Sequence, residues 1–127
     1  MIVGVGTDVV DIARVRRMLD ARGDRMLRRL FTAAEAAYSC ARPDPATHLA
    51  ARLAAKEAAF KALAGNELAR GIGWHDLEVL PFNGTRPEIS LHGRAHTRAT
   101  ELGVVHAWLS LTHSETTAVA FVVLERD

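Results

Sequence analysis

The apolar residues near both ends of this chain follow strand patterns. Residues 2–10 form an apolar run rich in valine, which predicts a buried strand. Residues 106–112 and 117–124 give two more strand patterns, joined by a short turn at 113–115.

A second pair of strand patterns lies further inside the chain, at residues 77–82 and 88–91. They flank Asn83-Gly84, a dipeptide typical of tight β-hairpin turns. Thr85-Arg86-Pro87 lengthens the connection, so a hairpin with a longer or bulged loop is predicted.

Helical spacing of apolar residues predicts two helices after the first strand. The first follows Asp11, which suits the N-cap, and Gly23 interrupts it before it ends near Leu30. The second opens with Thr32-Ala33-Ala34-Glu35, which has the form of a capping box, and ends near Cys40.

A longer helix is predicted after Asp44-Pro45, where the aspartate suits the N-cap and the proline the first helical position. It runs to Ala64, and Gly65 stops it before a loop that reaches Gly73. A last helix covers residues 93–102. The patterns together predict a compact α+β fold with a small antiparallel sheet and a long central helix.

Length and composition narrow the class of protein. A chain of 127 residues, 49% of them apolar, is expected to form a single domain, residues 1–127. The net charge of +1 gives no overall field toward nucleic acid or membrane, and no apolar run approaches the ~20 residues of a membrane span. Cys40 is the only cysteine, and the N-terminus has a strand pattern in place of a signal peptide. We therefore expect a cytoplasmic protein that binds neither nucleic acid nor membrane.

Arginines are concentrated in the first predicted helix, where three aspartates offset them only in part. This pattern fits an ordinary solvated face, and it also fits a docking surface for an acidic partner. The arginines are Arg14, Arg16, Arg17, Arg22, Arg25, Arg28 and Arg29.

Two carboxylates interrupt apolar segments that are far apart in the sequence. Asp8 lies in the first strand pattern, and Glu57 lies in the alanine-rich long helix with Lys61 one turn further on. An ionised carboxylate in apolar surroundings is costly unless it is paired or holds a cation. Asp8 could instead cap the following turn, and Glu57 and Lys61 could form an ordinary i,i+4 pair. Together they indicate a magnesium site to which phosphate oxygens and waters add further ligands.

Lys56 falls inside the apolar stripe of the long helix, which indicates a cleft, a subunit interface or a snorkelling side chain. Gly4-Val5-Gly6 lacks the third glycine of a dinucleotide fingerprint, so a Rossmann fold is rejected.

The histidines are weaker signals. His113, in the turn between the last two strands, is either a solvated turn residue or a hydrogen-bonding, titrating group in a phosphate site. His92 and His96 have helical spacing, but no further ligand is evident, so zinc is not expected.

Three blocks of the sequence together resemble the holo-acyl-carrier-protein synthase family, the small bacterial group of phosphopantetheinyl transferases. They are residues 4–12 (GVGTDVVDI) followed by Arg14, residues 51–62 (ARLAAKEAAFKA) and residues 109–114 (LSLTHS). The middle block is very specific to the superfamily, and the three are spread over most of the chain.

The resemblance implies an enzyme that transfers 4′-phosphopantetheine from coenzyme A to a serine of apo acyl carrier protein. Adenosine 3′,5′-bisphosphate would be the other product. It also implies magnesium dependence, the 4′-phosphopantetheinyl transferase fold, and typically a homotrimer with active sites between subunits. The carrier protein could serve fatty-acid, polyketide or peptide synthesis.

The resemblance further implies catalytic roles for single residues. Asp8 and Glu57 match magnesium ligands. Lys61 matches a residue that neutralises the pyrophosphate or the developing charge, and His113 matches one near the coenzyme A phosphates. The remaining positions that match contacts to coenzyme A are Arg52, Gly65, Asn83, Gly84, Arg86 and Pro87.

Partner binding is implied in the same way. Arg14 matches a position that meets the acidic recognition helix of the carrier protein, and Arg28 is expected to assist it. An arginine-rich helix would also steer an acidic partner toward the enzyme.

Two other functions stay open at this point. A non-catalytic module that binds coenzyme A or the carrier protein would not need Asp8, Glu57 and Lys61 together. A nucleic-acid-binding domain would use the N-terminal arginines, but the low net charge and 6% aromatic content argue against it. Within the enzyme, the base that accepts the serine proton is open among Glu57, Asp8 and a metal-bound water.

Overall fold

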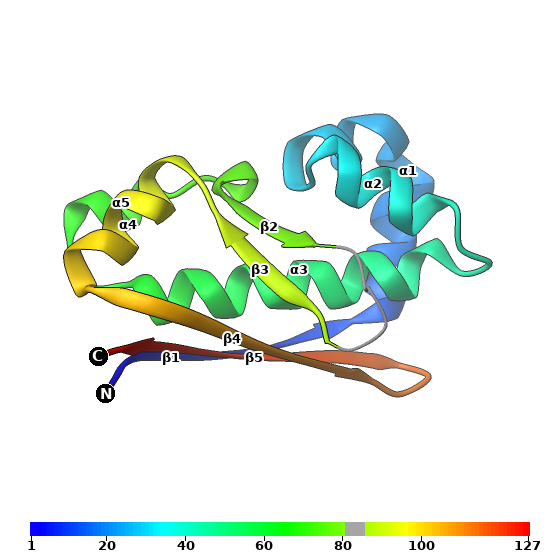
Figure 1. Ribbon diagram of the computed structural model, residues 1–127. Helices are drawn as coiled ribbons and strands as arrows, with labels where there is room; N and C mark the ends of the chain where they lie inside the picture. Colours follow the sequence, from blue (N-terminus) through cyan, green and yellow to red (C-terminus); the bar gives the residue numbers. More distant parts are fainter. Residues whose placement is uncertain (81–85) are drawn as a thin grey trace.

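An antiparallel sheet with a long helix lying across one of its faces organises the chain (Figure 1). The computed structural model describes residues 1–80 and 86–127, and within them the sheet has three strands in the order β1-β5-β4. The α+β fold class predicted from the sequence is confirmed. The elements of this layer are β1 (Ile2–Asp11), β4 (Val104–His113), β5 (Thr117–Arg126) and the long helix α3 (Pro45–Leu63).

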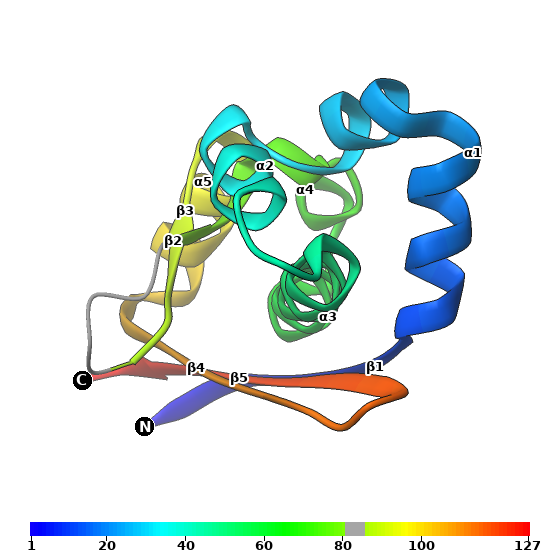
Figure 2. The same ribbon diagram turned by 90° about the vertical axis from the view of Figure 1, so that its right-hand side faces the viewer.

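The other elements surround α3 on its sides away from the sheet (Figure 2). They are α1 (Ile12–Leu30), α2 (Ala33–Cys40), α4 (Glu67–Arg70), the 3-10 turn η1 (Trp74–Asp76), β2 (Leu77–Leu80), β3 (Glu88–Leu91) and α5 (Gly93–Leu102). The predicted antiparallel pairing of the β2 and β3 segments is confirmed, whereas Asn83 and Gly84 lie outside the described residues. Across the described ranges, no helix has both the length and the apolarity to cross a membrane.

The backbone of β1 approaches α3 very closely. A Cβ atom on Gly4 would come within 2.2 Å of the Ala62 carbonyl oxygen, and one on Gly6 within 1.8 Å of the Ala58 carbonyl oxygen. The small residues of both elements therefore allow strand and helix to touch. The glycines that resembled part of a dinucleotide fingerprint serve this packing.

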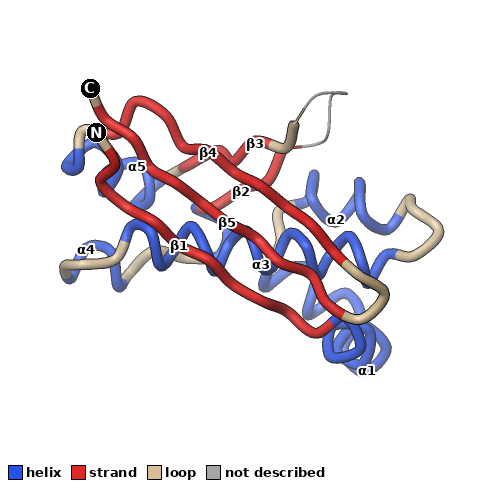
Figure 3. Tube along the Cα trace, turned by 90° about the horizontal axis from the view of Figure 1, so that it is seen from below, coloured by secondary structure: helices blue, strands red, loops and turns tan. Residues whose placement is uncertain are grey.

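The predicted strand over residues 2–10 is confirmed, but the prediction that it is buried is wrong. β1 is an edge strand, and its alternate side chains point away from α3 toward a face that no described element covers (Figure 3). A sheet covered on one side only must expose every second residue of each strand. The large apolar side chains exposed on this open sheet face are Ile2, Val5, Val9, Val105, Trp108 and Phe121.

Most helix boundaries follow the capping signals in the sequence. Asp11 accepts a hydrogen bond at the start of α1, Gly23 kinks that helix with a φ of 46°, and Thr32 opens α2 with a complete capping box. Asp44 stands at the N-cap position of α3, but its carboxylate binds the side chains of Thr47 and Arg16 in place of the helix backbone.

The segment 65–73 was expected to be a loop, and this expectation is wrong. It contains the short helix α4, which begins where the Asn66 side chain accepts a hydrogen bond from the Ala69 N–H at 2.9 Å. Four residues are too few to show helical periodicity, so only the capping asparagine marks the helix in the sequence.

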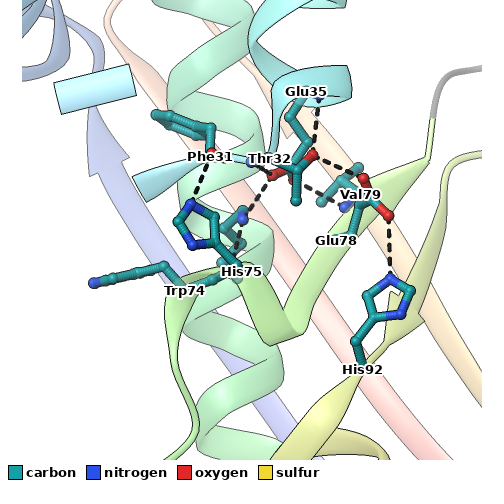
Figure 4. A network of polar contacts seen from close by, with 9 residues as sticks. Phe31, Thr32, Glu35, Trp74, His75, Glu78, Val79 and His92 are labelled. Carbon is teal, nitrogen blue, oxygen red and sulfur yellow. Dashed lines mark hydrogen bonds and ion pairs between the residues drawn. The ribbon is translucent and has the colours of Figure 1, made fainter. Parts of the chain in front are cut away.

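Lys56 lies inside the protein, and none of the three interpretations of its position in the helix stripe holds. Its Nζ is fully buried, 2.7 Å from Glu35 Oε1, and donates a hydrogen bond to the Trp74 carbonyl oxygen at 2.8 Å. Glu35 also accepts hydrogen bonds from the backbone N–H groups of Thr32 and Val79 (Figure 4). This ion pair therefore joins α3 to α2, β2 and η1.

Candidate functional site

Asp8, Glu57 and Lys61 come together where β1 crosses α3, and we call them the carboxylate cluster. Lys61 Nζ lies 2.9 Å from Asp8 Oδ1 and donates to the Thr7 carbonyl oxygen at 3.1 Å. The Asp8 side chain is only 13% exposed, and its second oxygen, Oδ2, is buried and accepts no hydrogen bond from the described residues when both carboxyls are ionised. The close packing of Gly6 on α3 brings Asp8 to this position.

The two carboxyl groups of the cluster perturb each other. Burial and the neighbouring Asp8 carboxylate raise the pKa of Glu57 to about 7. Burial alone would raise the pKa of Asp8 too, but hydrogen bonding with Glu57 and Lys61 outweighs it and lowers that pKa. Two close carboxyls that resist ionising together form a site where a cation can replace the shared proton.

The cluster fits a hard divalent cation with an incomplete protein shell. Asp8 and Glu57 share a hydrogen bond only while one of the two carboxyls keeps its proton, so once both are ionised the buried Asp8 Oδ2 is left without a donor. No group of three or more His, Cys, Asp or Glu side chains with metal-binding geometry occurs among residues 1–80 and 86–127. Two carboxylates with room for waters and phosphate oxygens are what Mg²⁺ usually receives from a protein.

A cavity of about 400 Å³ adjoins the carboxylate cluster. Its charged lining residues are Glu57, Lys61 and Arg70, and its walls include Phe60, Trp74 and Leu77. The backbone of Trp74 is fixed by the hydrogen bond that its carbonyl oxygen accepts from Lys56. A substrate with an anionic head and an uncharged tail could therefore place its head at the cluster and its tail in the cavity.

The arginine-rich helix α1 begins beside the carboxylate cluster. The charge of Arg14 reaches Glu57 and acts to lower its pKa. Arg28 lies beyond the kink at Gly23, in a separate hollow whose walls include Leu27 and Phe31. The seven arginines of α1 are all exposed, and of these Arg16 is already paired with Asp44: Arg14, Arg16, Arg17, Arg22, Arg25, Arg28 and Arg29.

Arg52 belongs to a second cationic group on another side of α3, which we call the arginine cluster: Arg42, Arg52, Tyr38 and His48. Arg52 is only 5% exposed, and its Nη1 donates to the His48 carbonyl oxygen at 3.2 Å. Arg52 and Glu57 are five positions apart, so they point about 140° away from each other around the helix. Figure 2 shows α2, which carries Tyr38, and β1, which carries Asp8, on different sides of α3.

His113 lies at the end of α3 where the helix begins. It is exposed, lines a shallow cavity with Asp44 and Thr47, and its charge acts on His48. Thr47 and Glu57 are ten residues apart, or about 15 Å along a helix. Within one chain the structure therefore brings His113 toward the arginine cluster and not toward the carboxylate cluster.

Gly65 follows the last turn of α3 with a φ of 136°. Arg98 closes this end of the helix, because its Nε donates to the Leu63 carbonyl oxygen at 2.8 Å and its Nη2 to the Ala64 carbonyl oxygen at 3.2 Å. A Cβ on Gly65 would come within 2.9 Å of that guanidinium. The conformation at this position favours glycine, whereas the guanidinium is the end of a flexible side chain and could shift.

Arg86 and Pro87 lie apart from both clusters, beside the sheet. The guanidinium of Arg86 lies 5.1 Å from the centre of the Trp108 ring, and the two residues line a cavity of about 290 Å³ with Pro87 and His106. Asn83 and Gly84, predicted to act with them, lie outside the described residues.

Sequence reasoning missed three members of the arginine cluster: Tyr38, Arg42 and His48. They come from α2, from the turn after it and from the first turns of α3. Only folding brings them together, and no spacing in the sequence marks them as a site.

Comparison with known proteins places this geometry in a family. Residues 4–122 match the 4′-phosphopantetheinyl transferase superfamily. The chain belongs to this superfamily. A holo-acyl-carrier-protein synthase of Alkalilimnicola ehrlichii is 49% identical over 126 residues, which cover 98% of this chain and 98% of that protein. The family resemblance read from the three sequence blocks is confirmed.

Solved structures of the superfamily have the same fold. The holo-acyl-carrier-protein synthase of Neisseria meningitidis superimposes with a TM-score of 0.85 at 29% identity, covering 99% of this chain and 100% of that one. The Bacillus anthracis synthase, solved in complex with CoA (3′,5′-ADP), gives 0.79 at 29% identity, covering 100% and 99% of the two chains.

Proposed function

We propose that this protein, acting as one domain over residues 1–127, is a holo-acyl-carrier-protein synthase. It transfers 4′-phosphopantetheine from coenzyme A to a serine of apo acyl carrier protein. The observation that carries the proposal is the carboxylate cluster, where Lys61 lies 2.9 Å from Asp8 beside a Glu57 whose pKa is raised to about 7. The 49% identity to a synthase over nearly the whole chain supports it.

The reaction exchanges the phosphoanhydride bond of coenzyme A for a phosphate ester bond to the carrier-protein serine. The serine oxygen of the carrier protein attacks the phosphorus that bears the pantetheine group. The bond from that phosphorus to the bridging oxygen of the pyrophosphate breaks, and adenosine 3′,5′-bisphosphate leaves. The serine proton passes to water or to a carboxylate of the cluster. Because the nucleophile belongs to the partner, the enzyme has to supply only positioning and charge neutralisation.

In this proposal Asp8 and Glu57 hold Mg²⁺ through their carboxylate oxygens. The ion, when bound, supplies positive charge to the oxygens of the pyrophosphate. Lys61 already lies at this point, so its ammonium group can move from Asp8 to a phosphate oxygen and neutralise the leaving group. His113 and Arg52 take the parts of coenzyme A that lie further from the reacting phosphorus.

We further propose that the active sites form between copies of the chain in a homotrimer. The carboxylate cluster and the arginine cluster lie on different sides of α3, so one bound coenzyme A reaches both more readily when a neighbour supplies the second. The open sheet face supports assembly, because it exposes six large apolar side chains, with Val9 63% and Phe121 46% exposed. Burial of such a patch between subunits is favourable.

The carrier protein docks on α1 in this account. Its recognition helix is acidic, and the exposed arginines of α1 complement it beside the carboxylate cluster. The lone, unpaired Cys40 fits a reducing compartment, so we place the reaction in the cytoplasm, in fatty-acid or polyketide synthesis.

A binding module without catalysis is the competing function. The two are separated by incubating the full chain with coenzyme A, Mg²⁺ and apo acyl carrier protein, and quantifying adenosine 3′,5′-bisphosphate by chromatography. The enzyme releases one nucleotide per carrier serine over many turnovers. Binding of coenzyme A or carrier protein without nucleotide release would leave only the binding module.

A further inference from the structure

Tyr38 lies close to two arginine side chains at once. The guanidinium carbon of Arg42 is 4.0 Å from the centre of the Tyr38 ring, and that of Arg52 is 4.4 Å from it. The His48 ring approaches the same ring edge-on, with 6.2 Å between the ring centres. One half-buried aromatic ring on α2 therefore contacts two cations and a histidine that come from the following turn and from α3.

The two arginines have no acidic partner of their own. In the part of the chain that the structure describes, neither Arg42 nor Arg52 forms an ion pair. Only 5% of Arg52 is exposed, and its Nε is a buried donor without an acceptor among the described residues. Glu35 acts on Arg52 from a distance, but it is already paired with Lys56.

Such an arrangement is unfavourable unless something compensates it. Like charges repel, and a buried N–H without an acceptor costs free energy. Contact with an aromatic ring offsets part of the repulsion. An anion with several oxygens would offset the rest, because guanidinium groups bind phosphate in a bidentate way.

The positive field also acts on His48. Burial and the charges of Arg52, Arg42 and His113 lower the pKa of His48, whereas Asp44 opposes them only weakly. The Asp44 carboxylate is itself bound to Arg16 and Thr47. The cluster thus keeps an excess of positive charge that suits an incoming anion.

Coenzyme A has two anionic groups, a pyrophosphate and a separate monophosphate on the ribose. The pyrophosphate is the group that reacts, so on the proposed function it belongs at the carboxylate cluster. The arginine cluster lies on another side of α3, so it can bind the ribose monophosphate. The coenzyme A that carries this phosphate would have its pyrophosphate at the carboxylate cluster of a neighbouring copy.

We propose that Tyr38 is a positioning residue that holds Arg42 and Arg52 together as the receptor for the ribose 3′-phosphate. Through them it sets the preference for coenzyme A over the analogue without that phosphate. The inference rests on the proposed function for the identity of the ligand. It rests on contacts of the chain itself for the role of the ring.

Removing the ring of Tyr38 and removing only its hydroxyl are expected to have different effects. Tyr38→Phe keeps the aromatic face that both arginines contact, so it should keep the preference. Tyr38→Leu removes the face and frees both arginines, so it should weaken the hold on the 3′-phosphate about tenfold. Tyr38→Phe is the matched control, because it removes the hydroxyl and keeps the ring.

The test measures binding and turnover in the full chain. Calorimetry gives the Kd of adenosine 3′,5′-bisphosphate and of adenosine 5′-monophosphate for the wild type, Tyr38→Phe and Tyr38→Leu. The expected result is a tighter Kd for the bisphosphate in the wild type and in Tyr38→Phe. In Tyr38→Leu that advantage falls about tenfold while the monophosphate Kd is unchanged. The KM for coenzyme A rises in parallel, and kcat at saturation stays the same.

Three outcomes would overturn the inference: equal weakening for both nucleotides in Tyr38→Leu, no change in Tyr38→Leu, or a loss in Tyr38→Phe as large as that in Tyr38→Leu. Should Tyr38→Leu fold poorly, two double-mutant cycles answer the same question. One combines Tyr38→Phe with Arg42→Gln, and the other combines Tyr38→His with Arg42→Gln. A role through the arginines predicts strong non-additivity for Tyr38→His, and additive losses contradict it.

Failure of this inference can be told from failure of the proposed function. If the wild type releases no adenosine 3′,5′-bisphosphate in the presence of carrier protein, the proposed function fails. If it does so and prefers the bisphosphate, but Tyr38→Leu leaves that preference intact, only the role of Tyr38 fails.

Discussion

Gly6 of β1 lies so close to Ala58 of α3 that a Cβ at position 6 would stand 1.8 Å from the Ala58 carbonyl oxygen. This contact sets how near the strand can come to the helix. Asp8 follows Gly6 by two residues on the same face of the strand, and Glu57 precedes Ala58. The position of the two carboxylates relative to each other therefore depends on a glycine that is not itself in the carboxylate cluster.

Gly6→Ala should accordingly damage both stability and activity. Strand and helix must separate to admit the methyl group, which should cost about 2–4 kcal/mol of unfolding free energy. Denaturant unfolding and turnover measure the two effects. Gly73→Ala is the control, because a Cβ there meets nothing nearer than 3.7 Å and its stability should change by less than ~0.5 kcal/mol. Equal stability of the two variants would show that β1 does not need the close contact.

The sequence was sufficient for the fold class, the hairpin of β2 and β3 and most helix ends, because these depend on local periodicity, turns and capping. It failed where tertiary packing decides. The apolar residues of 2–10 could not reveal that one face of β1 has no covering layer, and Lys56 could not reveal its partner Glu35 on another helix. The carboxylate cluster was predictable because each member interrupts an apolar pattern. Tyr38, Arg42 and His48 interrupt none, so their cluster became visible only in three dimensions.

The buried pair of Lys56 and Glu35 predicts a large cost for breaking it from one side. Lys56→Met leaves the Glu35 carboxylate buried without its cation and should lower the unfolding free energy by about 3–5 kcal/mol. The exposed pair of Arg16 and Asp44 offers the comparison, since its side chains are 48% and 52% exposed. Arg16→Met should cost less than about 1 kcal/mol. Similar losses in thermal or denaturant unfolding for the two variants would contradict the assigned role of the buried pair.

Glu57 predicts a pH dependence of stability in the presence of a chelator. Its pKa is raised in the folded protein to about 7 from an ordinary value of 4.5, so the folded state binds the proton more tightly. Its contribution to stability is therefore complete below pH 4.5 and is lost as the pH rises through about 7. In the wild type, the unfolding free energy should therefore fall by about 1–3 kcal/mol between pH 4.5 and pH 7 because of Glu57. In Glu57→Gln this fall should be absent. Parallel pH profiles of wild type and variant would rule the raised pKa out.

Arg14 predicts an effect specific to the carrier protein. Arg14→Ala should raise the KM for acyl carrier protein about tenfold and leave that for coenzyme A nearly unchanged, because an exposed arginine of α1 meets the acidic partner. The assay belongs at a pH well above 7, because Arg14 also lowers the pKa of Glu57. Arg22→Ala, at an exposed position further along the helix, is the control for charge alone. A matching rise in the KM for coenzyme A would argue against a docking role.

The open sheet face predicts that assembly and activity are lost together. Val9 is 63% exposed on this face, and Val9→Lys places a charge in the proposed subunit interface. Light scattering should then report the mass of a monomer, with little turnover, where the wild type gives a trimer. Thr97→Lys, on an exposed position of α5, should change neither. A wild type that is monomeric and fully active would overturn the shared active site.

The central claim is that the carboxylate cluster moves phosphopantetheine onto a carrier protein with the help of Mg²⁺. Intact mass spectrometry of apo acyl carrier protein, after incubation with this chain and coenzyme A, tests it most directly. The account predicts the gain of one phosphopantetheine group with the wild type and Mg²⁺, and almost none with a chelator or with a folded Asp8→Ala or Glu57→Ala variant. Full modification by both variants at saturating Mg²⁺, or no modification of any carrier protein by the wild type, would contradict it.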